Sequence, residues 1–291
     1  MAVGPPTDRS VIAPLPTMPE GNTIHRIAAS LTRSLTGKTL ERVTTQGLAR
    51  DLAGRTVTSV AAHGKHLVIE LDSGTQLRAH LGMNGRFRAY DRRAGDVALA
   101  RISPGRVSLA LITLDGVYLW LGAPTIEISQ RRDPRHGMAV SALGPDILAD
   151  DFRNRDAALR AAEHGPRRIA DVLLDQRIAS GIGNIYKCEA LFLTGIDPRV
   201  RVAELDVATL EAIYGAARRQ MTATLGASPR AMRASLAGTP RDDRYHVYGR
   251  TGKPCARCGT SIACALVGEP GRWTWWCPAC QAAASRSASP E

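Results

Sequence analysis

Apolar residues recur every three or four positions after Gly21, a spacing that predicts an amphipathic helix. Thr23 is in position to cap the start of this helix, and Gly37 is in position to end it. Because only one face is apolar, the helix needs a partner to cover that face. The apolar face consists of Ile24, Ile27, Ala28, Leu31 and Leu35.

Residues 55–90 alternate between apolar and polar side chains, which is typical of strands in a half-buried sheet. Turn residues between such runs indicate two hairpins. The first joins Leu67–Leu71 to Gln76–Leu81 through Asp72-Ser73-Gly74, and the second joins Ser108–Thr113 to Val117–Leu121 through Asp115-Gly116. The pattern predicts a mostly antiparallel β domain with the helix packed against it.

An alanine-rich helical pattern begins after Leu143-Gly144-Pro145 and predicts a second, helical domain. Between two of its helices, Ser180–Asn184 forms a glycine-rich turn that leads into a helix amino terminus. Free N–H groups and the helix dipole favour a phosphate there, although an ordinary helix–helix turn has the same spacing. The helical stretches are Phe152–Ala162, Ile169–Leu174, Ile185–Leu193 and Val207–Leu225.

The charge balance favours a polyanionic partner. The chain of 291 residues carries 38 basic and 27 acidic side chains, which gives a formal net charge of +11. This balance favours the phosphate interpretation of the glycine-rich turn. No run of 18 or more apolar residues is present, which argues against a membrane-spanning helix. Only four basic residues are lysines, so each lysine is a candidate for a role that needs its amine.

Four of the six cysteines form two Cys-x2-Cys pairs with 18 residues between them: Cys255 and Cys258, then Cys277 and Cys280. Four thiolates at this spacing predict one tetrahedral zinc ion. A closed shell leaves no open coordination position, so the ion would hold a small β-hairpin together and perform no chemistry. This use of cysteine suits a reducing cytosol.

The stretch before the second cysteine pair contains Arg272 and three tryptophans, Trp273, Trp275 and Trp276. An arginine in this stretch could reach a phosphate of a polyanionic partner. We expect at least two of the tryptophans to pack against the domain.

Met18-Pro19-Glu20-Gly21 has the most direct chemical consequence. If translation starts at Met18, removal of the methionine gives Pro19 a secondary amine that can attack an electrophilic sugar carbon. An internal Pro19 has only an amide nitrogen. Residues 1–18 contain several prolines and no periodicity, which predicts a disordered extension from a start assigned too early. A genuine disordered tail is the alternative.

In their order along the chain, these motifs resemble the formamidopyrimidine-DNA glycosylase/endonuclease VIII family of base-excision repair enzymes. The resemblance runs from Met18 to Cys280 and includes the amino-terminal Pro-Glu-Gly, the Gly-x-Gly-Asn turn and the cysteine pairs. Three further stretches contribute to it: His63–Leu67, His80–Gly85 and Val247–Arg250.

The resemblance implies an α+β multidomain fold. An antiparallel β-sandwich with a packed helix, the catalytic domain, would occupy 19–140. A helix–two-turn–helix DNA-binding domain would occupy 141–240, and a zinc-finger β-hairpin 241–282. A disordered tail would follow at 283–291.

The resemblance also implies residue roles. Pro19 matches the nucleophile that attacks the deoxyribose, and Glu20 matches the carboxylate that moves protons at the opening sugar. Lys65, Asn184 and Arg272 match residues that bind phosphates around the lesion, and Lys65 and Arg272 are also assigned to the catalytic site.

Met83 matches the residue that fills the gap left by an extruded base. Without the resemblance it would be interpreted as a core methionine. Thr23 is a departure, because the family often has a second glutamate there. One carboxylate of the proton relay is therefore missing.

The implied function is a bifunctional DNA glycosylase and abasic-site lyase that acts as a monomer on damaged double-stranded DNA in the cytoplasm, at the nucleoid. Pro-Glu-Gly favours the endonuclease VIII branch and therefore oxidised pyrimidines. If residues 1–18 are retained, the alternative is a non-catalytic, zinc-stabilised DNA-damage-binding protein. A zinc-ribbon module without lesion preference is a further alternative, but it leaves Pro19 and Glu20 unexplained.

Overall fold

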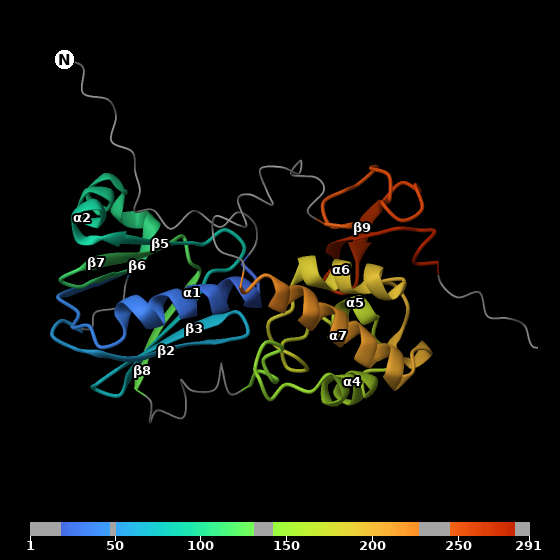
Figure 1. Ribbon diagram of the computed structural model, residues 1–291, viewed down its shortest axis with the longest axis horizontal. Coiled ribbons are helices and arrows are strands. Elements are labelled where there is room, and N and C mark those ends of the chain that lie inside the picture. Colours follow the sequence, from blue (N-terminus) through green and yellow to red (C-terminus); the bar gives the residue numbers. More distant parts are fainter. Residues whose placement is uncertain (1–18, 47–50, 131–141, 227–244, 283–291) are drawn as a thin grey trace, which may run out of the picture. The chain divides into compact units, whose positions relative to one another are not determined.

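The computed structural model describes residues 19–46, 51–130, 142–226 and 245–282, which fall into two compact units (Figure 1). Unit 1 is Met1–Ser141 and unit 2 is Ala142–Glu291. The disorder predicted for residues 1–18 and 283–291 concerns parts of the chain outside the described residues.

Helix α1, Gly21–Leu35, buries the apolar face that the sequence predicts. The predicted cap is wrong, because Glu20 is the N-cap residue and Thr23 lies inside the first turn. The Glu20 carbonyl accepts hydrogen bonds from the N–H groups of Thr23 and Ile24 at 2.9 and 3.2 Å. After the helix, Gly37 has a φ of 78°, the left-handed conformation that favours glycine.

Two four-stranded antiparallel sheets make up most of unit 1, with the orders β1-β6-β7-β5 and β2-β3-β4-β8. Both predicted hairpins are confirmed, as β3–β4 and β6–β7. The strands are β1 Arg42–Thr45, β2 Val57–His63, β3 His66–Leu71, β4 Thr75–His80, β5 Arg86–Asp91, β6 Val107–Ile112, β7 Gly116–Leu121 and β8 Thr125–Gln130.

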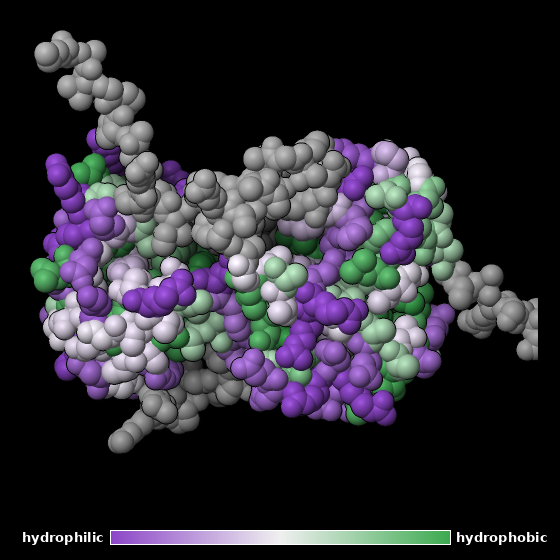
Figure 2. Space-filling view, viewed as in Figure 1, coloured by the Kyte–Doolittle hydropathy of each residue, from purple (hydrophilic) through white to green (hydrophobic). Residues whose placement is uncertain are grey.

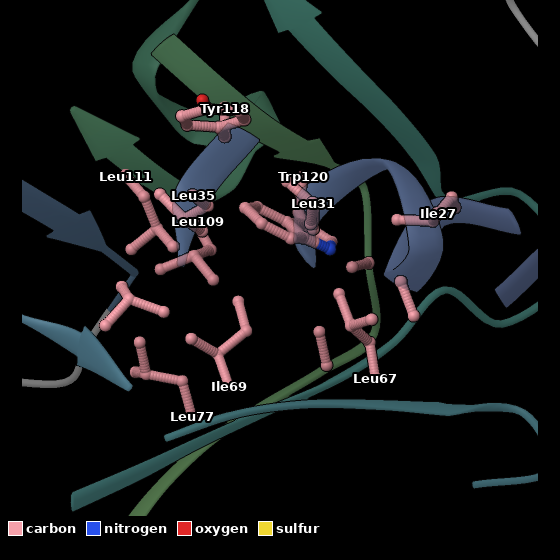
Figure 3. Packing of buried hydrophobic residues seen from close by; sticks show 14 of the residues in the cluster. Ile27, Leu31, Leu35, Leu67, Ile69, Leu77, Leu109, Leu111, Tyr118 and Trp120 are labelled. Carbon is pink, nitrogen blue, oxygen red and sulfur yellow. The ribbon is translucent and has the colours of Figure 1, made fainter. Parts of the chain in front are cut away.

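The core of unit 1 forms where α1 packs against side chains from both sheets (Figure 3). Leu35 of α1 lies close to Leu109 of β6, and Ile69 of β3 lies on the opposite side of the core. At the edge of this core, the Tyr118 hydroxyl donates to the Ser34 carbonyl at 2.9 Å. The predicted sandwich with a packed helix is confirmed.

Helix α2, Arg92–Arg101, follows β5 directly and was not predicted. The Asp91 carboxylate caps it by accepting from the Ala94 N–H at 2.8 Å. Gly95 is its one buried residue, so the helix has no apolar period in the sequence. A Cβ added to Gly95 would lie 2.3 Å from the Cβ of Val117, so glycine permits α2 to approach β7 closely.

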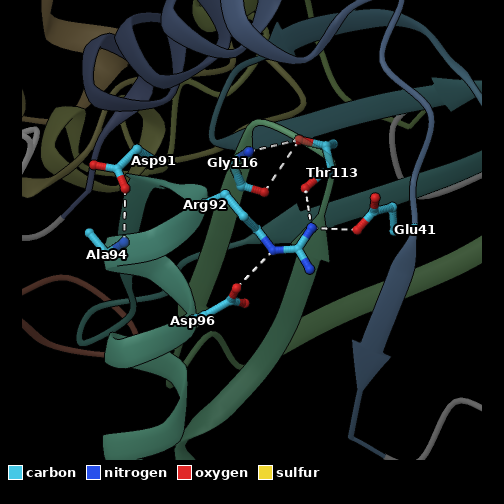
Figure 4. Close-up of polar contacts among 7 residues, drawn as sticks. All are labelled: Glu41, Asp91, Arg92, Ala94, Asp96, Thr113 and Gly116. Carbon is cyan, nitrogen blue, oxygen red and sulfur yellow. Dashed lines mark hydrogen bonds and ion pairs between the residues drawn. The ribbon is translucent and has the colours of Figure 1, made fainter.

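Arg92 connects the start of α2 to β1 and to the β6–β7 turn (Figure 4). Its guanidinium donates to the Asp96 carboxylate and to the Thr113 carbonyl, both at 2.9 Å, and it pairs with Glu41. The Gly116 N–H in turn donates to the Thr113 hydroxyl at 3.1 Å. These polar contacts hold the start of α2 to the sheet, and Leu99, partly buried near the other end of the helix, packs against the apolar cluster of β6 and β7.

Unit 2 contains the predicted helices, with α6 at its centre. Eight of the eleven residues of α6 are buried. A two-stranded antiparallel hairpin, β9–β10, completes the unit. The helices and strands of unit 2 are α4 Asn154–Ala162, α5 Ile169–Val172, α6 Asn184–Thr194, α7 Val207–Ala223, β9 Ala263–Val267 and β10 Arg272–Trp276. Short 3₁₀ turns lie at Pro104–Arg106 in unit 1 and at Val202–Glu204 in unit 2.

Hydrophilic residues are spread over the visible face of the described chain (Figure 2). Among the described residues, no helix is both long enough and apolar enough to cross a membrane.

Replacing Gly95 by alanine tests the close approach of α2 to β7. Alanine favours helix by about 1 kcal/mol, so an unstrained site would become more stable. We expect a net loss of about 1–3 kcal/mol in the free energy of unfolding, because the added Cβ overlaps Val117. Urea denaturation followed by circular dichroism measures it. Gly105→Ala is the matched control, since a Cβ there meets nothing within 4 Å; equal effects of the two substitutions would contradict the steric argument.

Candidate functional site

The start of α1 carries the residues proposed for covalent chemistry. Glu20 is only 2% exposed, and its backbone begins the helix. Pro19 is half-buried immediately before it. The partial positive charge of a helix amino terminus favours an ionised carboxylate. The fold therefore fixes Glu20 at the start of α1, in the position that follows Pro19.

Lys65 and Met83 project from the same end of one sheet. Lys65 lies in the turn between β2 and β3, and Met83 lies in the turn that follows β4. These turns are neighbours, because His66 of β3 pairs with His80 of β4. Met83 is 60% exposed, which excludes the core interpretation of this methionine.

The start of α1 points toward that end of the sheet. In Figure 3, Ile27 near the start of α1 lies on the same side as Leu67 at the start of β3, whereas Leu35 lies farther along with Ile69. Helix and strand therefore run in the same direction, and Pro19, which precedes α1, lies toward the same end of unit 1 as Lys65, which precedes β3.

Two histidines beside Lys65 are kept neutral. Burial, then His80 and Arg78, lower the pKa of His66 to about 4, so its Nδ1 accepts from Arg78 Nη1 at 2.8 Å. Burial, then Lys65, lower the pKa of His80. The His80 Nδ1 accepts from the Gly82 N–H at 3.1 Å, which leaves the ring proton on Nε2. The histidines therefore add no positive charge to that of Lys65 and Arg78 at this end of the sheet.

Arg78 is held from its other side by Glu127 across the β4–β8 pair. The Arg78 Nε donates to a Glu127 carboxylate oxygen at 3.0 Å. The rings of His66 and His80 lie 4.8 Å apart, centroid to centroid. His66 and His80 lie in motifs of the sequence, whereas Arg78 and Glu127 do not, and the pairing register, which sequence reasoning did not supply, brings the four together.

Helix α6 holds strand β10 with two side chains from its first turn. The Asn184 amide donates to the Trp273 carbonyl at 2.8 Å, and the Lys187 ammonium donates to the Thr274 hydroxyl at 2.7 Å. Lys187 is fully buried. The Thr274 hydroxyl donates onward to the Arg272 carbonyl at 2.9 Å. These hydrogen bonds hold Asn184 next to the start of β10, where Arg272 lies.

Glu189, also on α6, anchors the segment that enters the hairpin. Its carboxylate, 2% exposed, accepts hydrogen bonds at 2.9 Å from the backbone N–H groups of His246, Val247 and Tyr248. The His246 ring approaches it at 2.8 Å. A buried carboxylate needs such partners, so this segment is fixed to α6.

The four paired cysteines form a cluster that suits a tetrahedral metal ion. Their sulphur atoms all lie within 4.8 Å of one another. The Sγ–Sγ distances are 3.9 Å for Cys255–Cys280 and 3.4 Å for Cys258–Cys277. Zinc–sulphur bonds of about 2.3 Å in a tetrahedron require spacings of about 3.8 Å. The donor set and the geometry therefore fit one ion.

Ionisation of the cluster requires a cation. Hydrogen bonds from Thr260 lower the pKa of Cys258 to about 6. The neighbouring thiols, Cys258 first, raise the pKa of Cys280 to about 12, and burial raises the pKa of Cys277. Cys258 therefore ionises readily, and its negative charge opposes ionisation of the neighbouring thiols. A bound divalent cation compensates four thiolates, which is the chemistry expected of a structural metal centre.

Two of the three hairpin tryptophans pack against unit 2, as the sequence predicts. The Trp275 ring lies 4.7 Å from the Tyr248 ring, and its Nε1 donates to the Thr251 hydroxyl at 2.8 Å. Trp276 is 7% exposed, with the Arg199 guanidinium 5.0 Å from its ring. Trp273, in contrast, is 57% exposed.

The candidate residues thus form one group in each unit. Unit 1 collects Pro19, Glu20, Lys65 and Met83 toward one end. Unit 2 joins Asn184 to the strand of Arg272 and gathers the cysteines. Sequence reasoning missed the residues that hold these groups, although the scarcity of lysine marked Lys187. The missed residues are His66, Arg78, His80, Glu127, Lys187, Glu189 and Thr274.

Two family models match these units and together define the class of protein. Residues 18–115 match the formamidopyrimidine-DNA glycosylase N-terminal domain, and residues 143–234 match the formamidopyrimidine-DNA glycosylase H2TH domain. The chain therefore belongs to the formamidopyrimidine-DNA glycosylase/endonuclease VIII family.

Curated relatives match along nearly their whole length. The chain is 34% identical to a "Probable endonuclease 8 2" of Streptomyces coelicolor, covering 91% of this chain and 94% of the relative. It is also 34% identical to the "DNA-(apurinic or apyrimidinic site) lyase Nei2" of Mycolicibacterium smegmatis, covering 91% and 100%. A formamidopyrimidine-DNA glycosylase of Rhizorhabdus wittichii is 31% identical, with 92% and 100% covered.

A solved structure shares the fold at low sequence identity. The formamidopyrimidine-DNA glycosylase of Lactococcus lactis, bound to DNA containing an abasic site, superposes with a TM-score of 0.75 at 22% identity. The match covers 91% of this chain and all of that one.

Thr274→Val tests whether the buried ammonium holds β10. Valine keeps the shape but removes the acceptor at 2.7 Å from Lys187. We expect a loss of about 1–3 kcal/mol in the free energy of unfolding, because part of the desolvation cost of a buried charge is then uncompensated. Urea denaturation measures it. Thr274→Ser restores the hydroxyl and should recover most of the loss; a serine variant as unstable as the valine variant would contradict this account.

Proposed function

We propose that this protein is a base-excision repair DNA glycosylase with abasic-site lyase activity, acting through Pro19. The observation that carries the proposal is the family match beginning at residue 18, directly before Pro19 and the buried Glu20 at the start of α1. The names of the relatives, an endonuclease 8 and an abasic-site lyase, support the same activities.

Covalent catalysis follows from the secondary amine that Pro19 has in a chain processed after Met18. The nitrogen attacks C1′ of the damaged nucleoside, its proton passes to the Glu20 carboxylate, and the bond from C1′ to the base breaks as the base leaves as an anion that takes a proton from water. The sugar ring opens when O4′ accepts the proton that Glu20 has taken from the amine. The product is an iminium ion between Pro19 and the sugar.

Strand cleavage proceeds from that iminium. Loss of a proton from C2′ expels the 3′ phosphate, and a further elimination expels the 5′ phosphate, so β and δ eliminations cut on both sides of the sugar. Thr23 lies in the first turn of α1 where the family often has a second carboxylate. A hydroxyl does not relay protons at neutral pH as a carboxylate does, so we propose that Glu20 carries this role alone.

Phosphate binding is assigned to Lys65, Asn184 and Arg272. Lys65 supplies a charge beside neutral histidines, Asn184 begins α6, and Arg272 is exposed at the start of β10. Such contacts position and bend DNA without reading its sequence. Met83 is exposed in its turn and is an apolar side chain able to fill the gap left by an extruded base.

The substrate class we propose is damaged double-stranded DNA with an oxidised pyrimidine. Pro19-Glu20-Gly21 and the endonuclease 8 relatives support this preference over oxidised purines. We propose that the protein acts as a monomer on DNA in the cytoplasm, at the nucleoid. The net charge of +11 supports the polyanionic partner.

The metal we propose is one structural zinc ion held by Cys255, Cys258, Cys277 and Cys280. Four sulphur donors at tetrahedral spacing suit zinc. When bound, the ion supplies the charge that four thiolates require and stabilises the β9–β10 hairpin; it has no part in the bond-breaking steps.

Borohydride trapping tests the nucleophile. With a duplex carrying an oxidised pyrimidine, a chain begun at Met18 is expected to form a covalent DNA adduct. The full 291-residue chain is expected to form none, because its Pro19 nitrogen is an amide. Acetylating the amino terminus of the shorter chain should abolish the adduct.

The same experiment separates the second candidate function. If residues 1–18 are retained, the protein would be a non-catalytic DNA-damage binder. Absence of an adduct from both chains, on that lesion and on a plain abasic site, together with retained DNA binding, would reject the lyase and support the binder.

Zinc uptake should depend on pH through Cys258. Above about pH 6 this thiol is already ionised, so binding releases no proton from it; below about pH 6 it is protonated and must lose one. We expect proton release per zinc ion to rise by about one between pH 7.5 and pH 5, and zinc affinity to fall. Calorimetry in buffers of different ionisation enthalpy measures the protons. Cys264→Ser, outside the cluster, should change neither quantity, and a release independent of pH would contradict the assignment.

A further inference from the structure

Trp273 is unusual among the large aromatic side chains of this protein. All four tryptophans lie in described residues, and Trp273 is 57% exposed, whereas Trp120 and Trp276 are 1% and 7% exposed. Trp275 is partly buried beneath Tyr248. Trp273 therefore contributes little to the packing of its own unit.

A second exposed apolar residue lies directly opposite. Leu266 of β9 pairs with Trp273 of β10 and is 59% exposed. Because side chains alternate along a strand, Trp273 and Trp275 face the same side of the hairpin, away from buried Thr274. Trp275 is covered by the segment that contains Tyr248 and Thr251. The platform is defined here as Trp273 and Leu266, at the uncovered end of this face.

The backbone beneath the platform is rigidly held. The Trp273 carbonyl accepts from the Asn184 amide at 2.8 Å, and the neighbouring Thr274 is bonded to the buried Lys187. An aromatic ring on a fixed backbone loses little conformational freedom when it binds a partner. The side chain is therefore preorganised although it is exposed.

The chain segment that carries the platform has a basic excess, which favours a polyanion. Residues 245–281 contain four basic side chains and one acidic side chain, Glu269; the basic residues are Arg250, Lys253, Arg257 and Arg272. Arg250 and Lys253 flank Thr251, which contacts Trp275 on the same face as Trp273. Another protein would have to match this charge with acidic residues, whereas single-stranded nucleic acid supplies phosphates and flat bases together.

We propose that Trp273, supported by Leu266, is a stacking platform for an unpaired DNA base next to the lesion. Arg272 and Trp273 leave β10 on opposite faces, so a single strand crossing this end of the hairpin can place a phosphate at Arg272 and a base on Trp273. Bases inside an intact duplex have both faces occupied by stacking and cannot use the ring. The inference rests on the proposed function and adds a preference for bubble or single-stranded DNA around the damage.

Fluorescence anisotropy with the full chain tests the platform. The probes are a fully paired duplex and a bubble of unpaired bases, both containing the same stable abasic-site analogue. Trp273→Ala is expected to weaken binding to the bubble about tenfold, since stacking on an aromatic ring accounts for about 1–3 kcal/mol per base. Binding to the duplex should change less than about threefold. Trp273→Phe should keep most of the preference.

Leu159→Ala is the matched control, because Leu159 is an exposed apolar residue of unit 2 on α4 and is 47% exposed. It should alter neither affinity. Tryptophan emission gives a second readout: single-stranded DNA should quench the wild-type protein more than Trp273→Phe. Circular dichroism and zinc content show whether each variant is folded. If Trp273→Ala does not fold, the test of the platform is the difference in fluorescence quenching between the wild-type protein and Trp273→Phe.

Equal losses on duplex and bubble, or unchanged binding with no difference in quenching, would overturn the platform. A change only in self-association, seen by gel filtration, would overturn it in favour of a contact between copies. Borohydride trapping by the chain begun at Met18 reports separately on the proposed chemistry. Trapping without a bubble preference rejects the platform alone, whereas a bubble preference without trapping supports the platform and rejects the lyase.

Discussion

Burial of two charged side chains on α6 is the constraint on which unit 2 depends. Lys187 is fully buried and Glu189 is 2% exposed, so both side chains lose their hydration on folding. Both side chains form hydrogen bonds to the carboxyl-terminal segment, Lys187 to Thr274 and Glu189 to the backbone N–H groups of residues 246–248. Since an uncompensated buried charge costs several kcal/mol, α6 and the hairpin stabilise one another as a pair.

This mutual dependence explains how a short hairpin can hold functional groups in place. Two strands joined by a turn are marginally stable alone, and a metal ion constrains only the end near the cysteines. The contacts of Asn184 and Lys187 constrain the strand at Trp273 and Thr274. Arg272 and Trp273, at the other end of the hairpin, therefore have fixed backbones, although their own side chains are exposed.

Hydrophobic periodicity predicted most helices and strands, because an element that buries one face has apolar residues at regular spacing. It failed for α2, whose single fully buried residue is Gly95 and whose start is attached by polar contacts of Arg92, with only partly buried Leu99 packing against the sheet from its last turn. It also misplaced the cap of α1, since a carbonyl of Glu20 begins that helix and a hydroxyl of Thr23 is not required. For the sites, cysteine spacing predicted the cluster directly. The neutral state of His66 depends on strand register and burial, neither of which one sequence displays.

Binding and chemistry have different physical origins in this chain. The residues proposed for phosphate contacts, the cysteine cluster and the charged contacts of α6 are placed by folding and need no particular chain terminus. The nucleophile does, because no fold can give an internal proline nitrogen a reactive lone pair. Glu20 is buried at the start of α1, so folding alone places the proposed proton donor, whatever the chemical state of the Pro19 nitrogen. Under the proposed function, removal of the residues before Pro19 is therefore the step that separates a DNA-binding protein from an enzyme on the same fold.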